Sequence, residues 1–79
     1  MMTFAEELKR IRQRNFLSQD AFAKEVNVSF STVNRWESGK TRPNLAAMKN
    51  IKAFCERNRM DFSKLEELWF IETEGRQDD

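Results

Sequence analysis

Apolar residues recur three and four positions apart along most of this chain, which is the spacing that collects them on one face of a helix. The pattern indicates five helices, over residues 4–14, 19–26 and 29–38 and then starting at Asn44 and at Asp61. No stretch of the sequence alternates between apolar and polar residues as a half-buried strand does. The predicted fold is therefore all-α, with five helices.

Polar residues at the predicted helix ends support these boundaries. Thr3 and Glu6 have the spacing of a capping box, in which each side chain bonds the other residue's backbone N–H. Asn15 can close the first helix by taking the left-handed conformation, and Gly39 can close the third. Asp61 is the predicted cap of the last helix. The predicted caps of the helices between are Ser18, Ser29 and Asn44.

Composition restricts the chemistry that the chain can perform. It has 79 residues, of which 39% are hydrophobic and 34% charged, as is typical of one small folded domain. It contains no His, and Cys55 is its single cysteine. A Cys/His zinc site, a His-based catalytic triad and an internal disulfide are therefore excluded. We expect no metal, no cofactor and no enzymatic activity.

Positive charge is concentrated in the first half of the chain. Residues 1–43 carry eight Lys and Arg against five Asp and Glu, whereas residues 44–79 carry six against eight. A basic half suits a nucleic-acid-binding surface, although an ordinary solvated surface can show the same asymmetry. The N-terminus lacks the apolar segment of a signal peptide, and no apolar run reaches membrane-spanning length. The expected location is the cytoplasm.

The third predicted helix has two different faces. At about 100° per residue, Val33 and Trp36 fall on the side that can pack inward. The opposite side carries Phe30, Ser31, Asn34, Arg35 and Ser38. These side chains suit the major groove of DNA, because Arg can donate two hydrogen bonds to guanine and Asn can pair bidentately with adenine. The alternative is the ordinary solvated face of a surface helix.

The stretch LSQDAFAKEVNVSFSTVNRWESGKTRP, residues 17–43, resembles the helix-turn-helix of phage repressor and Cro-type regulators, the XRE family. The resemblance depends on Gln19, Ala23 and Val33 within the two helices, and on the run from Arg35 to Gly39 followed by Pro43. Extended over all five predicted helices, it covers about residues 3–70. It implies a lambda-repressor-like fold, a five-helix orthogonal bundle, and sequence-specific binding to double-stranded DNA at the nucleoid, as a transcriptional regulator.

The resemblance also implies a role for each matching position. The residues facing base edges would be Phe30, Ser31, Asn34 and Arg35. The residues holding phosphates would be Gln19, Ser29, Lys40, Thr41 and Arg42, with Gln19 also buttressing the recognition helix. Arg12 and Glu37 would form an ion pair that orients this helix; the alternative is that both are independently solvated.

Three positions depart from the family pattern. Asn27 stands where the turn usually has Gly, and Asn visits positive φ more readily than other non-Gly residues. Phe16 occupies another position that is often Gly, so the connection between the first two helices is expected to be rearranged. Phe30 replaces the common polar residue, which favours either apolar base contacts or a protein-protein use of this face.

The end of the last helix is unusually apolar. Leu68, Trp69, Phe70 and Ile71 are consecutive, and four consecutive residues of a helix cannot all face one core. We expect a homodimer through this end, the alternative being that the segment folds back over its own core. Residues 1–71 would form the domain and residues 72–79 a frayed, acidic tail. The rival function is an antitoxin or protein-interaction module that also binds DNA.

Overall fold

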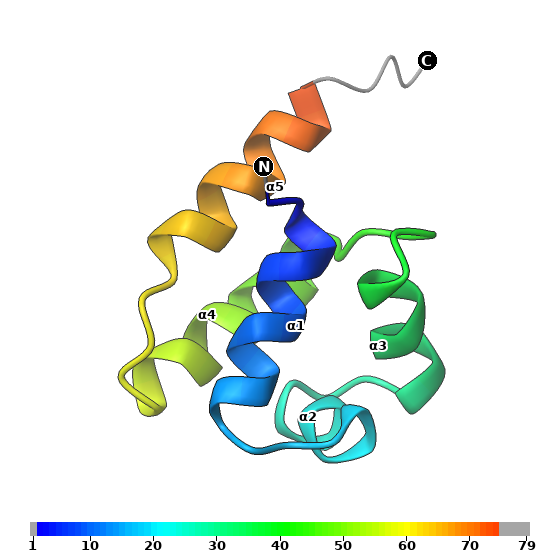
Figure 1. The fold of residues 1–79 in the computed structure, drawn as a ribbon, viewed down its shortest axis with the longest axis vertical. Helices are drawn as coiled ribbons and strands as arrows, with labels where there is room; N and C mark the ends of the chain where they lie inside the picture. The colour runs from blue at the N-terminus through cyan, green and yellow to red at the C-terminus, as the bar shows by residue number, and fades with distance from the viewer. Residues whose placement is uncertain (1, 75–79) are drawn as a thin grey trace.

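The computed structural model describes residues 2–74, with only the backbone of Glu74. This part of the chain forms five α-helices and no strand, as predicted. Their bounds are α1 (Phe4–Arg14), α2 (Gln19–Glu25), α3 (Phe30–Glu37), α4 (Leu45–Arg57) and α5 (Ser63–Glu74). Figure 1 shows α1 in the middle of the molecule, with α5 on one side, α2 and α3 on the other, and α4 behind. None of these helices is long and apolar enough to cross a membrane.

The predicted caps hold the first four helices at their N-termini. Thr3 and Glu6 form the complete capping box, in which the Thr3 N–H donates to Glu6 Oε1 at 2.9 Å and the Glu6 N–H to Thr3 Oγ1 at 3.2 Å. Ser18, Ser29 and Asn44 each accept from the backbone N–H three residues further on. These bonds satisfy N–H groups that a helix leaves without an internal partner, which explains the agreement at these boundaries.

Two predicted helix ends are corrected by the structure. The left-handed residue after α1 is Phe16, with φ 59°, whereas Asn15 has φ −97° and caps the helix by an ordinary turn. The reversal is set by the backbone, because the Leu17 N–H bonds back to the Arg12 carbonyl at 3.3 Å and thereby requires the left-handed residue at position 16. The second corrected end is that of α2, where Val26 is the C-cap and not, as predicted, the last helical residue.

Both ends of the last helix, α5, also differ from the prediction. Helix α5 begins at Ser63, and the Asp61 carboxylate accepts from the Ser63 N–H at 3.0 Å and from its hydroxyl at 2.8 Å. The hydrogen bonds from Ser63 lower the pKa of this carboxyl group. At its other end α5 continues to Glu74, so the helix includes the first residues of the predicted tail. The rest of that tail lies outside the described residues.

The core lies where α1, α2, α3, α4 and α5 meet, and it is built from the apolar stripes read in the sequence. Its fully enclosed members include Leu8, Phe22, Val33 and Ile51. The rings of Phe22 and Phe54 pack edge to face with centroids 5.1 Å apart. Both tryptophans, Trp36 and Trp69, belong to this core, and the Trp69 indole donates to the Pro43 carbonyl at 2.9 Å.

The sole cysteine of the sequence is a core residue rather than an exposed thiol. Cys55 lies on α4 with 0% of its surface exposed. Burial raises the pKa of its thiol to about 11, and the nearby carboxylates of Asp61, Glu7 and Glu56 contribute in the same direction. The thiol is therefore protonated at neutral pH and packs as a small apolar group.

Candidate nucleic-acid interface

Helices α2 and α3 form the helix-turn-helix of the chain. Asn27 takes the left-handed conformation in the turn, with φ 63°, as expected for the residue in the usual glycine position. The Val28 N–H then bonds back to the Ala23 carbonyl at 2.9 Å. Ala23 on α2 and Val33 on α3 are both buried in the core, and the two helices pack against each other.

Helix α3 buries and exposes the side chains that its sequence pattern predicted. Val33 and Trp36 are buried, whereas Ser31, Asn34, Arg35 and Ser38 are exposed. Phe30 is half exposed at the N-terminal end of the helix. An exposed row with short polar side chains, one Arg and no carboxylate therefore runs along the recognition helix.

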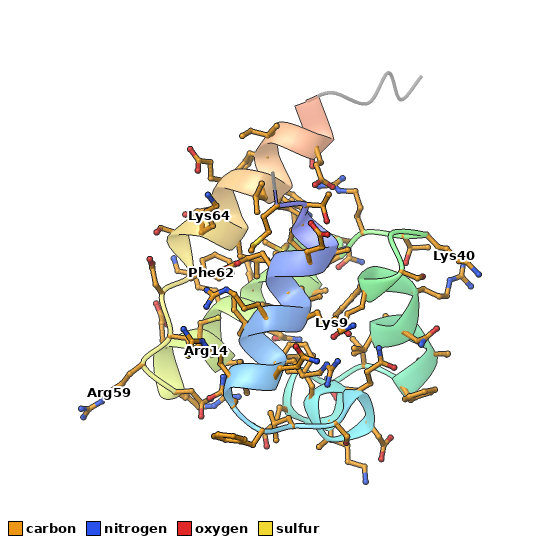
Figure 2. The ribbon with its side chains drawn as sticks, viewed as in Figure 1. Lys9, Arg14, Lys40, Arg59, Phe62 and Lys64 are labelled. Carbon is orange, nitrogen blue, oxygen red and sulfur yellow. The ribbon has the colours of Figure 1, made fainter. Side chains whose placement is uncertain are left out.

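Ser29 and the loop after α3 flank this row at its two ends. The Ser29 hydroxyl accepts from the Thr32 N–H at 3.2 Å and bonds the Ser31 hydroxyl at 3.1 Å. At the other end the Arg35 carbonyl accepts from the Lys40 N–H at 3.0 Å and from the Thr41 N–H at 3.4 Å. Figure 2 shows the Lys40 side chain extending outward from this loop. The backbone bonds thus fix a Lys beside the end of the polar row.

A buried ion pair connects α1 to the end of α3. Arg12 donates from Nε to Glu37 Oε2 at 2.7 Å and from Nη2 to Oε1 at 2.9 Å. The side chains of Arg12 and Glu37 are only 10% and 3% exposed, respectively. Arg12 also donates from Nη1 to the Leu17 carbonyl at 2.8 Å, which ties down the α1–α2 connection. The predicted Arg12–Glu37 pair is therefore present, in bidentate geometry.

Gln19 extends this ion pair to the outward face of α3. Its Nε2 donates to Glu37 Oε1 at 3.0 Å, and its Oε1 accepts from Asn34 Nδ2 at 3.1 Å. The predicted buttress is thus present, and it reaches one of the predicted base-contacting residues. No pattern in the sequence indicates this last bond, because its partners come from different helices and meet only through the way those helices cross.

The structure does not place Arg42 with the other predicted phosphate contacts. Its guanidinium lies over the Trp69 ring, 5.1 Å from the centroid, and donates to the Trp69 carbonyl at 2.7 Å. It also bonds the Thr73 hydroxyl. The Trp69 ring and the hydrogen-bond acceptors on α5 together interact with this side chain more favourably than solvent does. Arg42 therefore joins the loop after α3 to α5 in this structure, and its contact with a phosphate stays a prediction.

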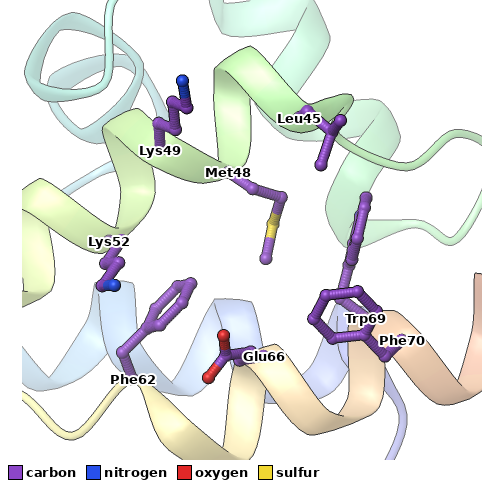
Figure 3. Close-up of a pocket in the computed structure, with 8 residues that line it drawn as sticks. All are labelled: Leu45, Met48, Lys49, Lys52, Phe62, Glu66, Trp69 and Phe70. Carbon is purple, nitrogen blue, oxygen red and sulfur yellow. The ribbon is translucent and has the colours of Figure 1, made fainter.

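A second surface feature is a groove of about 240 Å³ between α4 and α5 (Figure 3). Its apolar lining consists of Leu45, Met48, Phe62, Trp69 and Phe70, and its polar lining of Lys49, Lys52 and Glu66. Beside it the predicted apolar end of α5 is divided. Trp69 is buried and Leu68 partly buried, whereas Phe70 is 48% and Ile71 57% exposed. The segment therefore covers its own core only in part.

The fold and this geometry define a helix-turn-helix domain with an exposed recognition helix. A family model described as helix-turn-helix matches residues 8–58. The HTH-type transcriptional activator BcrR of Enterococcus faecalis is 36% identical over 76 residues, which are 95% of this chain and 37% of that relative. The chain therefore belongs to the XRE-type helix-turn-helix family, and the predicted class, a DNA-binding domain of the regulator kind, is confirmed. No solved structure matches it significantly.

Proposed function

We propose that this chain binds double-stranded DNA sequence-specifically, with the outward face of α3 in the major groove, and thereby regulates transcription. The observation that carries the proposal is the exposed row of Ser31, Asn34 and Arg35 on a helix fixed from behind by a buried ion pair. A groove about 12 Å wide accepts such a helix, and these side chains can read base edges. The relative's name, a transcriptional activator, supports the regulatory part.

Phosphate contacts in this proposal come from both ends of α3. Ser29 lies at its N-terminus, and Lys40 and Thr41 lie in the loop after its C-terminus. Phe30, half exposed, would add an apolar contact to a thymine methyl group. Gln19 also stays a predicted phosphate contact, at the N-terminus of α2. We propose a binding role without catalysis, carried out in the cytoplasm at the nucleoid.

The test compares two variants of the proposed face on DNA selected from a random-sequence duplex library. Arg35→Ala should relax base preference at one position and cost about 1–3 kcal/mol on the preferred sequence. Lys40→Ala should weaken binding to all sequences alike and reduce the slope of log K against log salt by about one unit.

Lys64→Ala is the matched control for the loss of one positive charge. Figure 2 shows Lys64 on α5, on the opposite side of the molecule from Lys40. This variant should bind like the wild type and keep its salt slope. Unchanged binding in both Arg35→Ala and Lys40→Ala, or an equal loss in Lys64→Ala, would reject the assigned face.

The proposal includes a homodimer formed through α5. Leu45, Phe70 and Ile71 are large apolar side chains left exposed at or beside the groove between α4 and α5. Lys49 and Glu66 give the groove both signs of charge, which suits a two-fold interface where the same patch meets itself. A two-fold dimer would also match two operator half-sites.

Sedimentation velocity at tens of micromolar tests the dimer. The wild type should sediment as a dimer and Ile71→Glu as a folded monomer, because the variant places a charge in the interface without touching the core. A monomeric wild type would reject the dimer. In that case the groove would favour the rival interpretation, a protein-interaction module of the antitoxin kind whose partner occupies it.

A further inference from the structure

We propose that Trp69 is a positioning residue for DNA binding, which holds the loop between α3 and α4 so that Lys40 meets a phosphate. The inference rests on the proposed function, in which Lys40 contacts the DNA backbone, and adds a residue from α5, a helix outside the proposed interface. The loop consists of residues 39–43, between the C-cap of α3 at Ser38 and the N-cap of α4 at Asn44. Its two ends are held by different helices.

The start of the loop is held by one acceptor on α3. The Arg35 carbonyl accepts both from the Lys40 N–H, at 3.0 Å, and from the Thr41 N–H, at 3.4 Å. Gly39, with φ 79°, precedes these residues, and no atom of the described residues, its chain neighbours aside, lies within 4 Å of where its Cβ would be. A shared acceptor at a helix end, beside an unpacked glycine, resists local opening only weakly. The position of the loop therefore depends on a second attachment.

The second attachment is Trp69 on α5. Its indole Nε1–H donates to the Pro43 carbonyl at 2.9 Å. Its backbone carbonyl accepts from Arg42 Nη2 at 2.7 Å, and the Arg42 guanidinium lies over its ring, 5.1 Å from the centroid. Figure 3 shows the ring extending from α5 toward the start of α4, where Leu45 lies. Three contacts with one residue therefore fix the last two residues of the loop.

Burial makes this attachment firm. Trp69 is 8% exposed and Pro43 is buried, so breaking the bond between them would leave an acceptor unsatisfied inside the protein. Arg42 also donates to the Thr73 hydroxyl, one turn further along α5, and that hydroxyl donates to the Trp69 carbonyl at 2.6 Å. The end of the loop is thus tied to α5 and moves only with it.

A fixed loop lowers the cost of the Lys40 contact with DNA. Lys40 is exposed and extends outward from the loop (Figure 2), so its side chain loses freedom when it binds a phosphate. A backbone already held in place adds no further loss, which is the advantage of a preorganised binding segment. Phosphate contacts carry no sequence information, so the loop affects affinity and its salt dependence and leaves base preference to α3.

The test uses a variant that changes no charge. Trp69→Phe keeps an aromatic ring under Arg42 and removes the indole N–H. Wild type, Trp69→Phe, Lys40→Ala and the double variant are titrated with the duplex selected for the wild type over a range of salt concentrations. Leu65→Val is the matched control, because Leu65 is fully buried on the same helix and has no polar side-chain group to bond the loop. Thermal melting and sedimentation establish that each variant is folded and has the oligomeric state of the wild type.

The expected result is a loss of salt dependence without a loss of charge. Trp69→Phe should weaken DNA binding about threefold to tenfold and lower the slope of log K against log salt. In the Lys40→Ala background it should lower the slope no further, because its effect on the slope acts through Lys40. Base preference should stay that of the wild type, and Leu65→Val should keep the wild-type slope.

A second variant and a measurement without DNA test the same attachment. Arg42→Lys keeps the positive charge but loses the planar guanidinium over the Trp69 ring, so it should lower the slope as Trp69→Phe does. A direct phosphate contact by Arg42 would instead leave the slope unchanged, since Lys also binds phosphate. In the free protein, amide hydrogen exchange at Lys40 and Thr41 should be about tenfold faster in Trp69→Phe and unchanged in Leu65→Val.

Three outcomes would overturn the inference, and they are distinguishable. If Trp69→Phe and Arg42→Lys keep the wild-type slope, or if Trp69→Phe lowers the slope equally in the Lys40→Ala background, Trp69 does not act through Lys40 and the proposed function stands. Unchanged amide exchange at Lys40 in Trp69→Phe would show that Trp69 does not hold the loop. If the wild type selects no preferred sequence, the proposed function and the inference fail together.

Discussion

Removing the Arg12 side chain should be among the most damaging single changes in this chain. The Glu37 side chain is 3% exposed, and Arg12 supplies two of the hydrogen bonds to its carboxylate. Arg12→Met fills a similar volume but leaves a buried negative charge without its cation. Breaking a buried pair in this way costs about 3–5 kcal/mol. A 79-residue domain has about 4–12 kcal/mol in total, so the variant should lose much of its stability.

Urea denaturation of three variants separates the buried charge from the loss of packing. Glu37→Met should be destabilised as strongly as Arg12→Met, because it leaves the Arg12 guanidinium buried and unpaired. The double variant, with Met at both positions, has no unpaired charge and should recover to within about 1–2 kcal/mol of the wild type. The remaining cost comes from the Leu17 carbonyl, which loses its Arg12 donor in this variant, and from the Gln19 amide, which loses its Glu37 acceptor.

An exposed pair in the same protein provides the control. On α2, Lys24 Nζ lies 3.6 Å from Asp20 Oδ2, and the two side chains are 78% and 62% exposed, respectively. Lys24→Ala should change the free energy of unfolding by no more than about 0.5 kcal/mol. The reasoning is refuted if Arg12→Met costs as little as Lys24→Ala, or if the double variant is as unstable as the sum of the two single ones.

Three further changes test single features of the fold. Phe16, 95% exposed with φ 59°, gains nothing from packing, so Phe16→Gly should stabilise the chain by about 0.5–1 kcal/mol in thermal melts, whereas Phe16→Ala should not. Asn44→Ala removes the bond that the Ala47 N–H donates at 2.9 Å and should cost about 1 kcal/mol in urea melts, while exposed Lys49→Ala should cost less. The pKa of Cys55 is raised from 9.0 to about 11, so the stability that the protonated buried thiol contributes is complete below pH 9 and is lost as the pH rises toward 11. In urea melts across this window the free energy of unfolding should fall more steeply for the wild type than for Cys55→Ala. Equal slopes would contradict the raised pKa.

The features that sequence predicted well are those that depend on neighbours along the chain. A capping box at Thr3 and Glu6 placed the start of α1, and the apolar spacing of Val33 and Trp36 divided α3 into its two faces, because both effects act within a few residues. The Arg12–Glu37 pair was found only through resemblance to the family, since no local rule connects residues 25 positions apart.

The features that sequence missed depend on how the helices cross. Arg42 was expected to face DNA. Its side chain is long enough to reach several partners, and the packing of α5 places the Trp69 ring under its guanidinium. The hydrogen bond between Gln19 and Asn34 also depends on how two helices, α2 and α3, cross.

The left-handed residue after α1 was missed for a different reason. Asn15 was assigned the left-handed conformation from its intrinsic preference, whereas the register of the turn gives that conformation to Phe16 at some cost in strain.

The buried thiol of Cys55 makes the chain a reporter of its own opening. A thiol-specific reagent reaches a fully enclosed side chain only in molecules that have unfolded around it, so the labelling rate measures the opening equilibrium under native conditions. A ligand that binds the folded chain alone slows labelling in proportion to the fraction bound. Because Cys55 lies on α4, outside α2 and α3, labelling rates measured without and with DNA give the stability of a variant and its affinity for DNA, with no engineered cysteine.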